Sequence, residues 1–275
     1  MRHYRNLVRH PLWMVGVLLL LGAVLLLEMA FDSPAFADDP GQGRSFVIEL
    51  AHLSLGNPQL VLRQPIKATP AAPGWTEVMA EDFEGPWPAP GWTAFDADDP
   101  PSLNGEYYWD VTTCFDYGAS GNHKAVPHAA GADASYTCWQ PYPPNLNSWM
   151  AYGPFDLSEA TAAEVSFYFW LDSEKEHDWF YWMASLDGAE FYGPKVSGQV
   201  PGGWTDFDLT AVPTPNGDLI DCTGQAQVWI AFAFTSDDHV DADHSGVWLD
   251  DIALRCKLTL PFRIYLPVVL KNHPT

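Results

Sequence analysis

The chain has 275 residues and a formal net charge of −22. A chain this acidic repels the phosphates of DNA and RNA, which excludes a nucleic-acid-binding protein. Its 13 Trp, 11 Tyr and 15 Phe favour strands, and its 24 Pro and 21 Gly indicate many turns and few long helices.

The N-terminus has the three parts of a secretory signal in the usual order. Three arginines occur within the first nine residues, an uninterrupted apolar run follows over 12–27, and Ala35-Phe36-Ala37 is a small-x-small cleavage pattern. We therefore predict that residues 1–37 export the chain and that its folded part is extracellular or at the cell surface.

An uncleaved membrane anchor is the alternative reading of the same segment. The apolar stretch over 12–31 is then the membrane contact, because about 20 apolar residues cross a bilayer. The arginines would stay in the cytoplasm and the rest of the chain would still lie outside.

Export places the four cysteines in an oxidising compartment, and their even number then predicts disulfides. Three pairings of Cys114, Cys138, Cys222 and Cys256 are possible. We favour Cys114–Cys138, which closes a Gly/Pro-rich loop, and Cys222–Cys256, which ties a loop to the last strand. Each bridge would stabilise the fold by about 2–4 kcal/mol.

The mature chain divides into a leader with a Pro/Ala-rich linker (38–75), one β domain (76–256) and a tail (257–275). Apolar and amphipathic side chains alternate with period 2 over 165–171 and 228–234, which is typical of strands. The leader segment 45–55 fits a strand or a short helix. Further strands are expected over 78–84, 106–111, 148–154, 177–185, 204–209 and 246–254.

This spacing of short strands and turns predicts an all-β protein, an antiparallel β-sandwich or jelly roll, preceded by the N-terminal signal or transmembrane helix. The purely apolar set of each strand should form the core between two layers. In the run HDWFYWMAS (177–185) the pattern does not tell which alternate pair faces inward.

The opposite set of two strands carries large amphipathic rings. Tyr168, Trp170 and Trp229 have apolar faces with polar groups, so we predict that they form a ligand-binding platform. The alternative is that the long loop 112–147 covers them.

Six blocks of sequence together resemble one family of secreted bacterial domains. They are EDFEGPWPAPGWTAFD (81–96), SWMAYGPFDLSEAT (148–161), DWFYWMASLDG (178–188), WTDFDLT (204–210), QVWIAFAFTSD (227–237) and GVWLDDIAL (246–254). In this order they look like the MAM-like or immune-inhibitor-A-like jelly-roll domains. The resemblance implies a concanavalin-like sandwich with adhesive or accessory functions. The chain departs from that pattern in its long loop with its own cysteine pair.

The resemblance also implies a calcium site, since the first and last strands of such sandwiches tend to be neighbours. Asp82 and Glu84 lie in the first strand, and Asp250 and Asp251 in the last. Carboxylates brought together repel one another unless a cation compensates, and Ca²⁺ takes six to eight oxygen ligands. Glu84 and Asp251 match the motif best. The alternative is an acidic surface cluster without a metal.

A second acidic cluster lies in the loop 236–246, where Asp237 and Asp238 are candidate calcium ligands. The segment lacks the register of an EF-hand loop, so a solvated loop is the alternative.

The leading hypothesis is a secreted, calcium-stabilised, non-catalytic β-sandwich that binds a glycan or an extracellular protein. One rival is a structural, envelope-anchored protein. The other is a hydrolase of unrecognised type, for which the alternating Glu174, Glu176 and Asp178 are candidate carboxylates.

Overall fold

A computed structural model describes residues 46–55, 60, 64–67, 74–98, 104–114, 118–138, 140–239 and 243–258. The predicted export segment and almost all of the predicted tail lie outside these residues. Every regular element in the described ranges is a strand, and none of them contains a helix suited to crossing a membrane. The prediction of an all-β chain is confirmed for this part.

The strands of the described ranges overlap every period-2 segment of the sequence, but others were not predicted, and Lys124–Ala130 is a strand inside the segment 112–147 that was predicted to be a loop. They are β1 (Phe46–Ser54), β2 (Ile66–Lys67), β3 (Trp75–Glu81), β4 (Trp92–Asp96), β5 (Tyr108–Thr112), β6 (Lys124–Ala130), β7 (Asn147–Asp156), β8 (Ala160–Asp172), β9 (Trp179–Ser185), β10 (Glu190–Asp208), β11 (Val212–Pro213), β12 (Leu219–Ile220), β13 (Val228–Thr235) and β14 (Gly246–Leu258).

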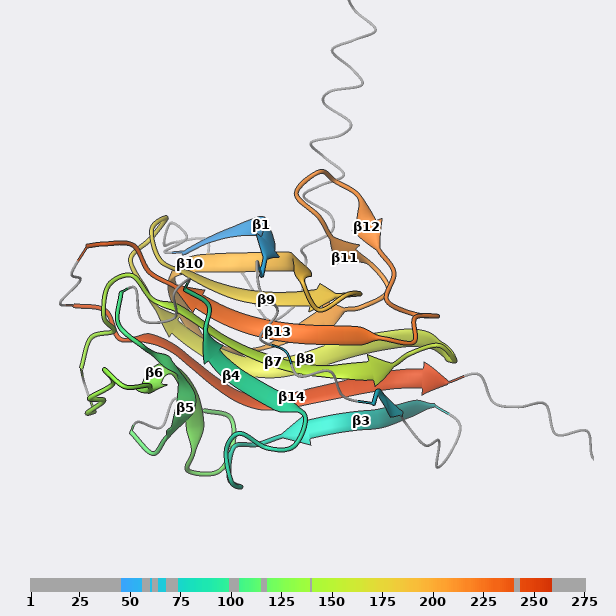
Figure 1. The fold of residues 1–275 in the computed structure, drawn as a ribbon, viewed down its shortest axis with the longest axis horizontal. Helices are drawn as coiled ribbons and strands as arrows, with labels where there is room; N and C mark the ends of the chain where they lie inside the picture. The colour runs from blue at the N-terminus through green and yellow to red at the C-terminus, as the bar shows by residue number, and fades with distance from the viewer. Residues whose placement is uncertain are drawn as a thin grey trace, which may run out of the picture. The chain divides into compact units, whose positions relative to one another are not determined.

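Most strands belong to one curled sheet whose two halves face each other (Figure 1). Half A has the order β7-β13-β9-β10-β1, with β4 and the short parallel β2 on the other side of β7. Half B has the order β10-β8-β14, with β3 and β6 on the far side of β14 and β5 beyond β6. Every pairing except β2–β7 is antiparallel.

Strand β10 is shared by the two halves. Its first part, up to Gly198, pairs with β1 and β9, and its second part, from Gln199, pairs with β8. The strand passes from one half into the other at Gly198–Gln199, and its register with β8 shifts just beyond, between Val200 and Gly203. The two layers are therefore hydrogen-bonded into a single sheet.

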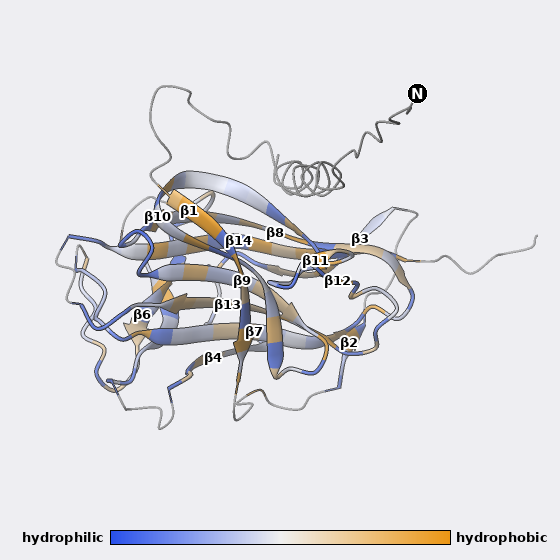
Figure 2. Cartoon of the chain, turned by 90° about the horizontal axis from the view of Figure 1, so that it is seen from above, coloured by the Kyte–Doolittle hydropathy of each residue, from blue (hydrophilic) through white to orange (hydrophobic). Residues whose placement is uncertain are grey.

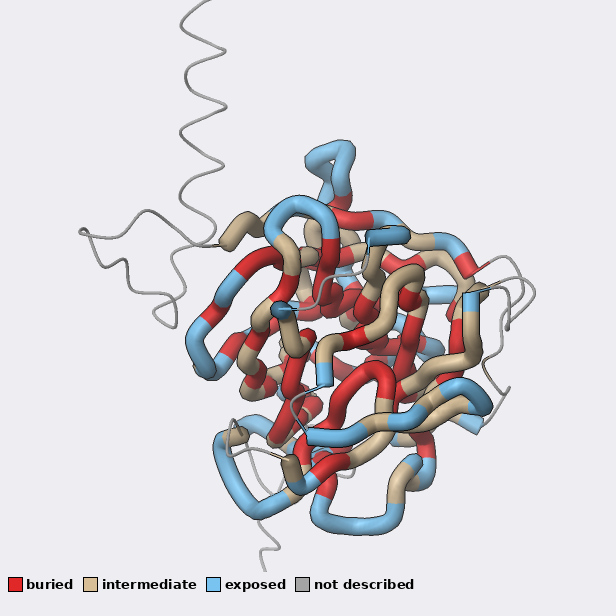
Figure 3. Tube along the Cα trace, turned by 90° about the vertical axis from the view of Figure 1, so that its left-hand side faces the viewer, coloured by how far each residue is buried: buried red, intermediate tan, exposed pale blue. Residues whose placement is uncertain are grey.

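The core between the halves is aromatic. Phe167 of β8 contacts Trp182 of β9 and Phe232 of β13, with ring centroids 5.8 Å and 5.0 Å away. Phe169 contacts Phe180 of β9 at 5.1 Å. Phe180 and Trp182 thus face inward, which settles the orientation that the alternation left open. Figure 3 shows buried residues running along the strands and exposed residues on the loops.

The described part of the segment 45–55 is a strand rather than a helix. All nine residues of β1 pair with β10, from Phe46 opposite Gly198 to Ser54 opposite Glu190. Hydrophobic positions of β1 are visible in Figure 2. Part of the predicted leader is therefore built into half A.

Candidate functional site

The structure separates the three residues predicted to form a ligand platform. Tyr168 and Trp170 lie half-buried on the outer face of half B, opposite in direction to Phe167 and Phe169. Trp229 lies in half A and is only 3% exposed. The prediction of one platform containing Trp229 is wrong, because alternation tells which side of a strand a residue takes but not which half the strand joins.

Trp229 belongs instead to a buried cluster that we call the closed face. It consists of side chains from β1, β4, β7, β9, β10 and β13 of half A, together with a residue just after β1. They are Ala51, Leu55, Phe95, Trp149, Ala151, Trp179, Tyr181, Met183, Phe191, Trp229, Ala231 and Ala233. These rings are structural in this arrangement.

The outer face of half B carries an aromatic residue that the sequence analysis did not single out. Trp204 of β10 lies directly opposite Tyr168 in the register, and the two rings meet edge to face with centroids 5.9 Å apart. The Trp204 residue is 49% exposed. The signal was present in WTDFDLT, where Trp204 alternates with the buried Phe207.

Two further rings extend this row across the sheet. Trp170 lies opposite Trp248 of β14, and the two pack edge to face at 5.1 Å. Trp248 is 1% exposed and packs beside Trp170. We call Trp204, Tyr168, Trp170 and Trp248 the aromatic face.

Polar side chains flank the aromatic face on the same strands. Asp206 follows Trp204 by two residues, so it points to the same side, and it is exposed. Asp172 accepts a hydrogen bond from Gln199 at 3.1 Å and pairs with the His244 ring at 2.8 Å. Rings with carboxylates beside them suit a ligand that has an apolar face and hydroxyl groups.

Three predicted calcium ligands converge on one loop, 118–123. Glu84 accepts the backbone N–H of Asn122 at 2.5 Å and of His123 at 2.7 Å. These bonds and the bond from the His123 ring lower the pKa of Glu84 to about 2. Asp82 and Glu84 lie just after β3 and not in the strand as predicted, and Asp82 accepts the backbone N–H of Glu84 at 3.1 Å in the turn there.

The last strand holds the other side of this loop. Asp250 is fully buried and accepts the backbone N–H groups of Ala119 and Ser120 at 2.9 Å and 3.2 Å. Asp251 accepts the Ser120 hydroxyl at 2.8 Å. Burial raises the pKa of Asp250.

A buried lysine binds the carbonyls of the same loop. Lys124 is 1% exposed, and its ammonium donates to the carbonyls of Ser120 and Gly121 at 3.3 Å and 3.2 Å. In the described part of the chain no three His, Cys, Asp or Glu side chains are arranged to hold a metal ion. Calcium at Glu84 and Asp251 therefore stays a prediction.

The second acidic cluster is engaged in loop hydrogen bonds. Asp237 pairs with the His177 ring at 3.1 Å and accepts the backbone N–H of His239 at 2.8 Å. Asp238 is exposed. Asp178, a candidate hydrolase carboxylate, is buried and accepts a short hydrogen bond from the Tyr142 hydroxyl.

The predicted disulfide between Cys114 and Cys138 is confirmed. Their Cα atoms are 5.3 Å apart and the bridge spans 24 positions of the chain. It ties the segment after β5 to the segment that leads toward β7.

The predicted Cys222–Cys256 bridge is wrong, because both thiols are free and buried. Cys256 pairs with Ala163 of β8, the carbonyl of Ala163 accepts the N–H of Leu209, and the carbonyl of Leu209 accepts the N–H of Cys222. Two chain segments thus lie between the cysteines, which places them about 14 Å apart at about 4.8 Å per strand. A disulfide needs Cα atoms within about 7 Å.

No family model and no curated protein matches the chain. The resemblance to MAM-like domains therefore stays a prediction.

Solved structures with a similar arrangement are adhesin and carbohydrate-binding modules. The K3 cleaved adhesin domain of Lys-gingipain from Porphyromonas gingivalis is 19% identical, with 65% of this chain and 98% of that chain covered and a TM-score of 0.38. A family 11 carbohydrate-binding module from Clostridium thermocellum, in complex with a β-1,3-1,4-mixed-linked tetrasaccharide, is 15% identical, with coverages of 67% and 96% and a TM-score of 0.34. The CBM35 from Paenibacillus barcinonensis is 13% identical, with coverages of 64% and 97% and a TM-score of 0.33. At these sequence identities and TM-scores, the similarity says nothing about the ligand of this chain.

Proposed function

We propose that the folded part of this chain is an extracellular, non-catalytic, jelly-roll binding module, and that it binds glycan through the aromatic face of half B. The observation that carries the proposal is Trp204, a large ring half open to solvent and held edge to face against Tyr168. Because exposing a large ring forgoes the free energy of burying it, such a ring on the surface of a sheet favours a stacking role.

The surroundings of the ring favour a sugar over a protein partner. Protein-binding patches are contiguous apolar surfaces of several hundred Å². Among the described residues, the other large exposed apolar side chains are Trp75, Leu186 and Leu219, none of them on the strands that carry the aromatic face. A single ring bordered by Asp206 matches a sugar, whose C–H face stacks while its hydroxyls donate to carboxylates.

Export by residues 1–37 is part of the same proposal. It is supported by the Cys114–Cys138 bridge, since structural disulfides form in oxidising compartments outside the cytosol. If the signal is not cleaved, residues 12–31 anchor the module to the membrane.

Calcium stabilisation is a further part of the proposal. Glu84, Asp250 and Asp251 lie far apart in the sequence and bind the same loop, 118–123. A Ca²⁺ ion would need oxygen ligands that are now engaged within the loop, so its binding requires a local rearrangement.

The test of glycan binding uses two matched tryptophan variants and a glycan array probed with the full chain. Trp204→Ala should weaken binding about tenfold, which corresponds to ~1.4 kcal/mol of lost stacking. Trp75→Ala is the control, because Trp75 is similarly exposed, at 40%, but its ring already contacts two cations. The Lys257 ammonium and the Arg255 guanidinium lie 4.6 Å and 5.3 Å from the ring centroid.

Two results would overturn the proposal. One is that no glycan on the array binds the chain. The other is that Trp75→Ala weakens binding as much as Trp204→Ala does, because the effect would then not belong to the aromatic face.

A further inference from the structure

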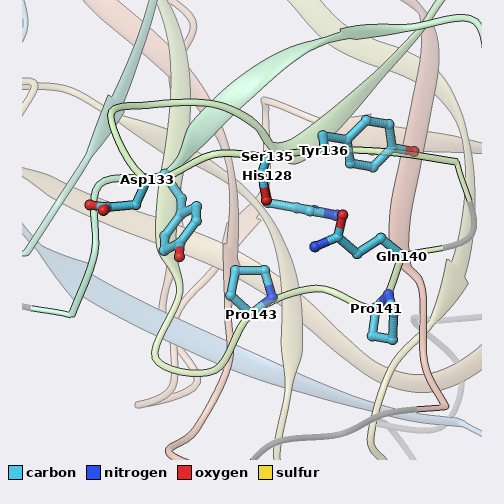
Figure 4. Close-up of a pocket in the computed structure, with 8 residues that line it drawn as sticks. His128, Asp133, Ser135, Tyr136, Gln140, Pro141 and Pro143 are labelled. Atoms are coloured by element: carbon cyan, nitrogen blue, oxygen red, sulfur yellow. The ribbon is translucent and has the colours of Figure 1, made fainter.

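A small pocket lies among β5, β6 and the segments that flank them, on different strands from those that carry the aromatic face (Figure 4). Its volume is about 80 Å³. The lining residues are Tyr107, His128, Asp133, Ser135, Tyr136, Gln140, Pro141 and Pro143.

The floor of the pocket is a histidine with unused hydrogen-bonding groups. His128 of β6 is 3% exposed, and neither of its ring nitrogens has a hydrogen-bond partner in the described part of the protein. Burial lowers its pKa to about 3, so the ring is neutral at physiological pH. A neutral imidazole has one N–H donor and one acceptor, and a buried polar group left unpaired costs about 1–3 kcal/mol.

The rim adds polar groups that are open to solvent. Gln140 is exposed, and its side-chain oxygen accepts the N–H and the hydroxyl of Thr137 at 3.3 Å and 3.2 Å. Within the described residues its amide nitrogen donates to no acceptor, so its protons are open to a ligand. Asp133 accepts the N–H of Glu106 at 3.0 Å, and the hydroxyl of Ser135 lies on the same rim.

The walls are rings. Tyr136 meets the His128 ring edge to face at 5.0 Å, and Tyr107, Pro141 and Pro143 complete the apolar lining. Burial, and then the charge of Asp133, raise the pKa of Tyr107, so its hydroxyl stays protonated and can donate.

Two features hold these walls in place without a ligand. Gly131 has φ +119°, and a Cβ atom there would lie 2.0 Å from the carbonyl oxygen of Glu106. Only glycine lets the 131–136 segment approach the Tyr107 segment this closely. The Cys114–Cys138 bridge fixes the neighbouring Thr137 to Gln140 turn.

We propose that this pocket is a second binding site, which takes a hydroxyl-bearing group of a neutral sugar on His128. A hydroxyl is both donor and acceptor, so one hydroxyl can bond one ring nitrogen whichever tautomer the ring adopts, and since both nitrogens are buried the rim must open to admit it. A carboxylate fits less well, because it has no proton to donate and is repelled by the charge of Asp133. An ammonium group also fits less well, because it cannot accept a hydrogen bond. The pocket is small, at about 80 Å³, so a hydroxyl or hydroxymethyl group enters while the sugar ring stays at the rim.

The experiment titrates the full chain with methyl glycosides of glucose, galactose and mannose, and with methyl glucuronide, at millimolar concentrations, followed by NMR of the histidine ring signals. At least one neutral glycoside should shift the His128 signals, and the glucuronide should bind at least tenfold more weakly. His128→Phe keeps the ring shape, removes both nitrogens and should abolish the binding at an unchanged or higher melting temperature. Gln140→Ala, at the exposed rim, should weaken it about tenfold.

Trp204→Ala is the control that separates the two sites. It should leave the His128 shifts unchanged. Glycoside binding that survives His128→Phe but not Trp204→Ala overturns the pocket and leaves the aromatic face intact. A pocket that holds only water, with no shift for any glycoside, also overturns the proposal, as does equal binding of the glucuronide.

Discussion

The outer faces of the two halves both carry large aromatic side chains, but only one of them is open. On half A, Trp149 and Trp229 are 2% and 3% exposed within the closed face. On half B, Trp204 is 49% exposed on the aromatic face. The same alternation of residue types thus gives a second hydrophobic core on one side and a solvent-accessible surface on the other.

The difference follows from which chain segments reach each face. Ala51 of β1, and Leu55 just after it, pack into the closed face together with Phe95 of β4. On half B, Trp204 lies on the outer part of β10, whose flanking outward residues Gly202 and Asp206 are also exposed. Exposure of an aromatic strand residue is therefore decided by long-range packing.

The largest expected difference in stability is between truncating a tryptophan of the closed face and truncating one of the aromatic face. Trp149→Ala should lower the free energy of unfolding by about 3–5 kcal/mol, because it leaves a cavity and removes the partner of Asn147. Trp204→Ala should change it by less than about 0.5 kcal/mol. Urea unfolding followed by circular dichroism measures both, and equal losses would contradict the comparison.

Calcium should stabilise the molecule through half B. Removing it with EDTA should lower the free energy of unfolding by about 2.7 kcal/mol if the ion was present at 100 times its Kd. Glu84→Gln should remove the response, whereas Glu49→Gln on β1 should keep it. A melting curve that EDTA leaves unchanged would remove the calcium proposal.

Lowering the pH should destabilise the fold through His128 on β6, which also belongs to half B. The folded pKa of His128 is about 3, below its ordinary value of 6.5, so the unfolded chain binds the proton more readily. Stability should therefore fall as pH falls through 6.5, by about 1–2 kcal/mol between pH 7 and pH 5. His128→Phe should lose less stability over that interval than the wild type; parallel curves would show that the ring is not buried neutral.

The smallest expected effect concerns the number of reactive thiols, because this prediction involves no change in stability. Cys222 and Cys256 should react with an alkylating agent only after unfolding, and Cys114 and Cys138 only after reduction as well. Mass spectrometry should therefore find two alkylated cysteines after unfolding and four after reduction. If no cysteine of the unfolded chain were alkylated without reductant, the second disulfide would be present after all.

The sequence predicts strands well where its period-2 signal is uninterrupted. Val165 to Leu171 and Val228 to Phe234 alternate cleanly, and they form β8 and β13. The long β10 was expected only over 204–209, because Gly193, Pro194 and Gly198 interrupt its first part. Gly193 and Pro194 pair with β1 but not with β9, so the missing N–H of Pro194 costs no hydrogen bond to β9.

The candidate site was predictable only in part. β3 and β14 pair with each other, as the resemblance implied for the first and last strands, but the binding of Glu84 and Asp251 to loop 118–123 was not predicted. Trp204 was missed although its alternation with Phe207 was visible. His128 could not be found from sequence, because its apolar neighbours in KAVPHAA are equally typical of a core position with satisfied hydrogen bonds.

Strand β10 has a consequence for how the domain opens. Its backbone amides are protected by β1 and β9 at one end and by β8 at the other. Neither layer can detach while this strand stays intact, so fluctuations that expose one layer must also release the other. Amides of β8, β9 and β10 should then exchange with deuterium at one common rate, as a single cooperative unit.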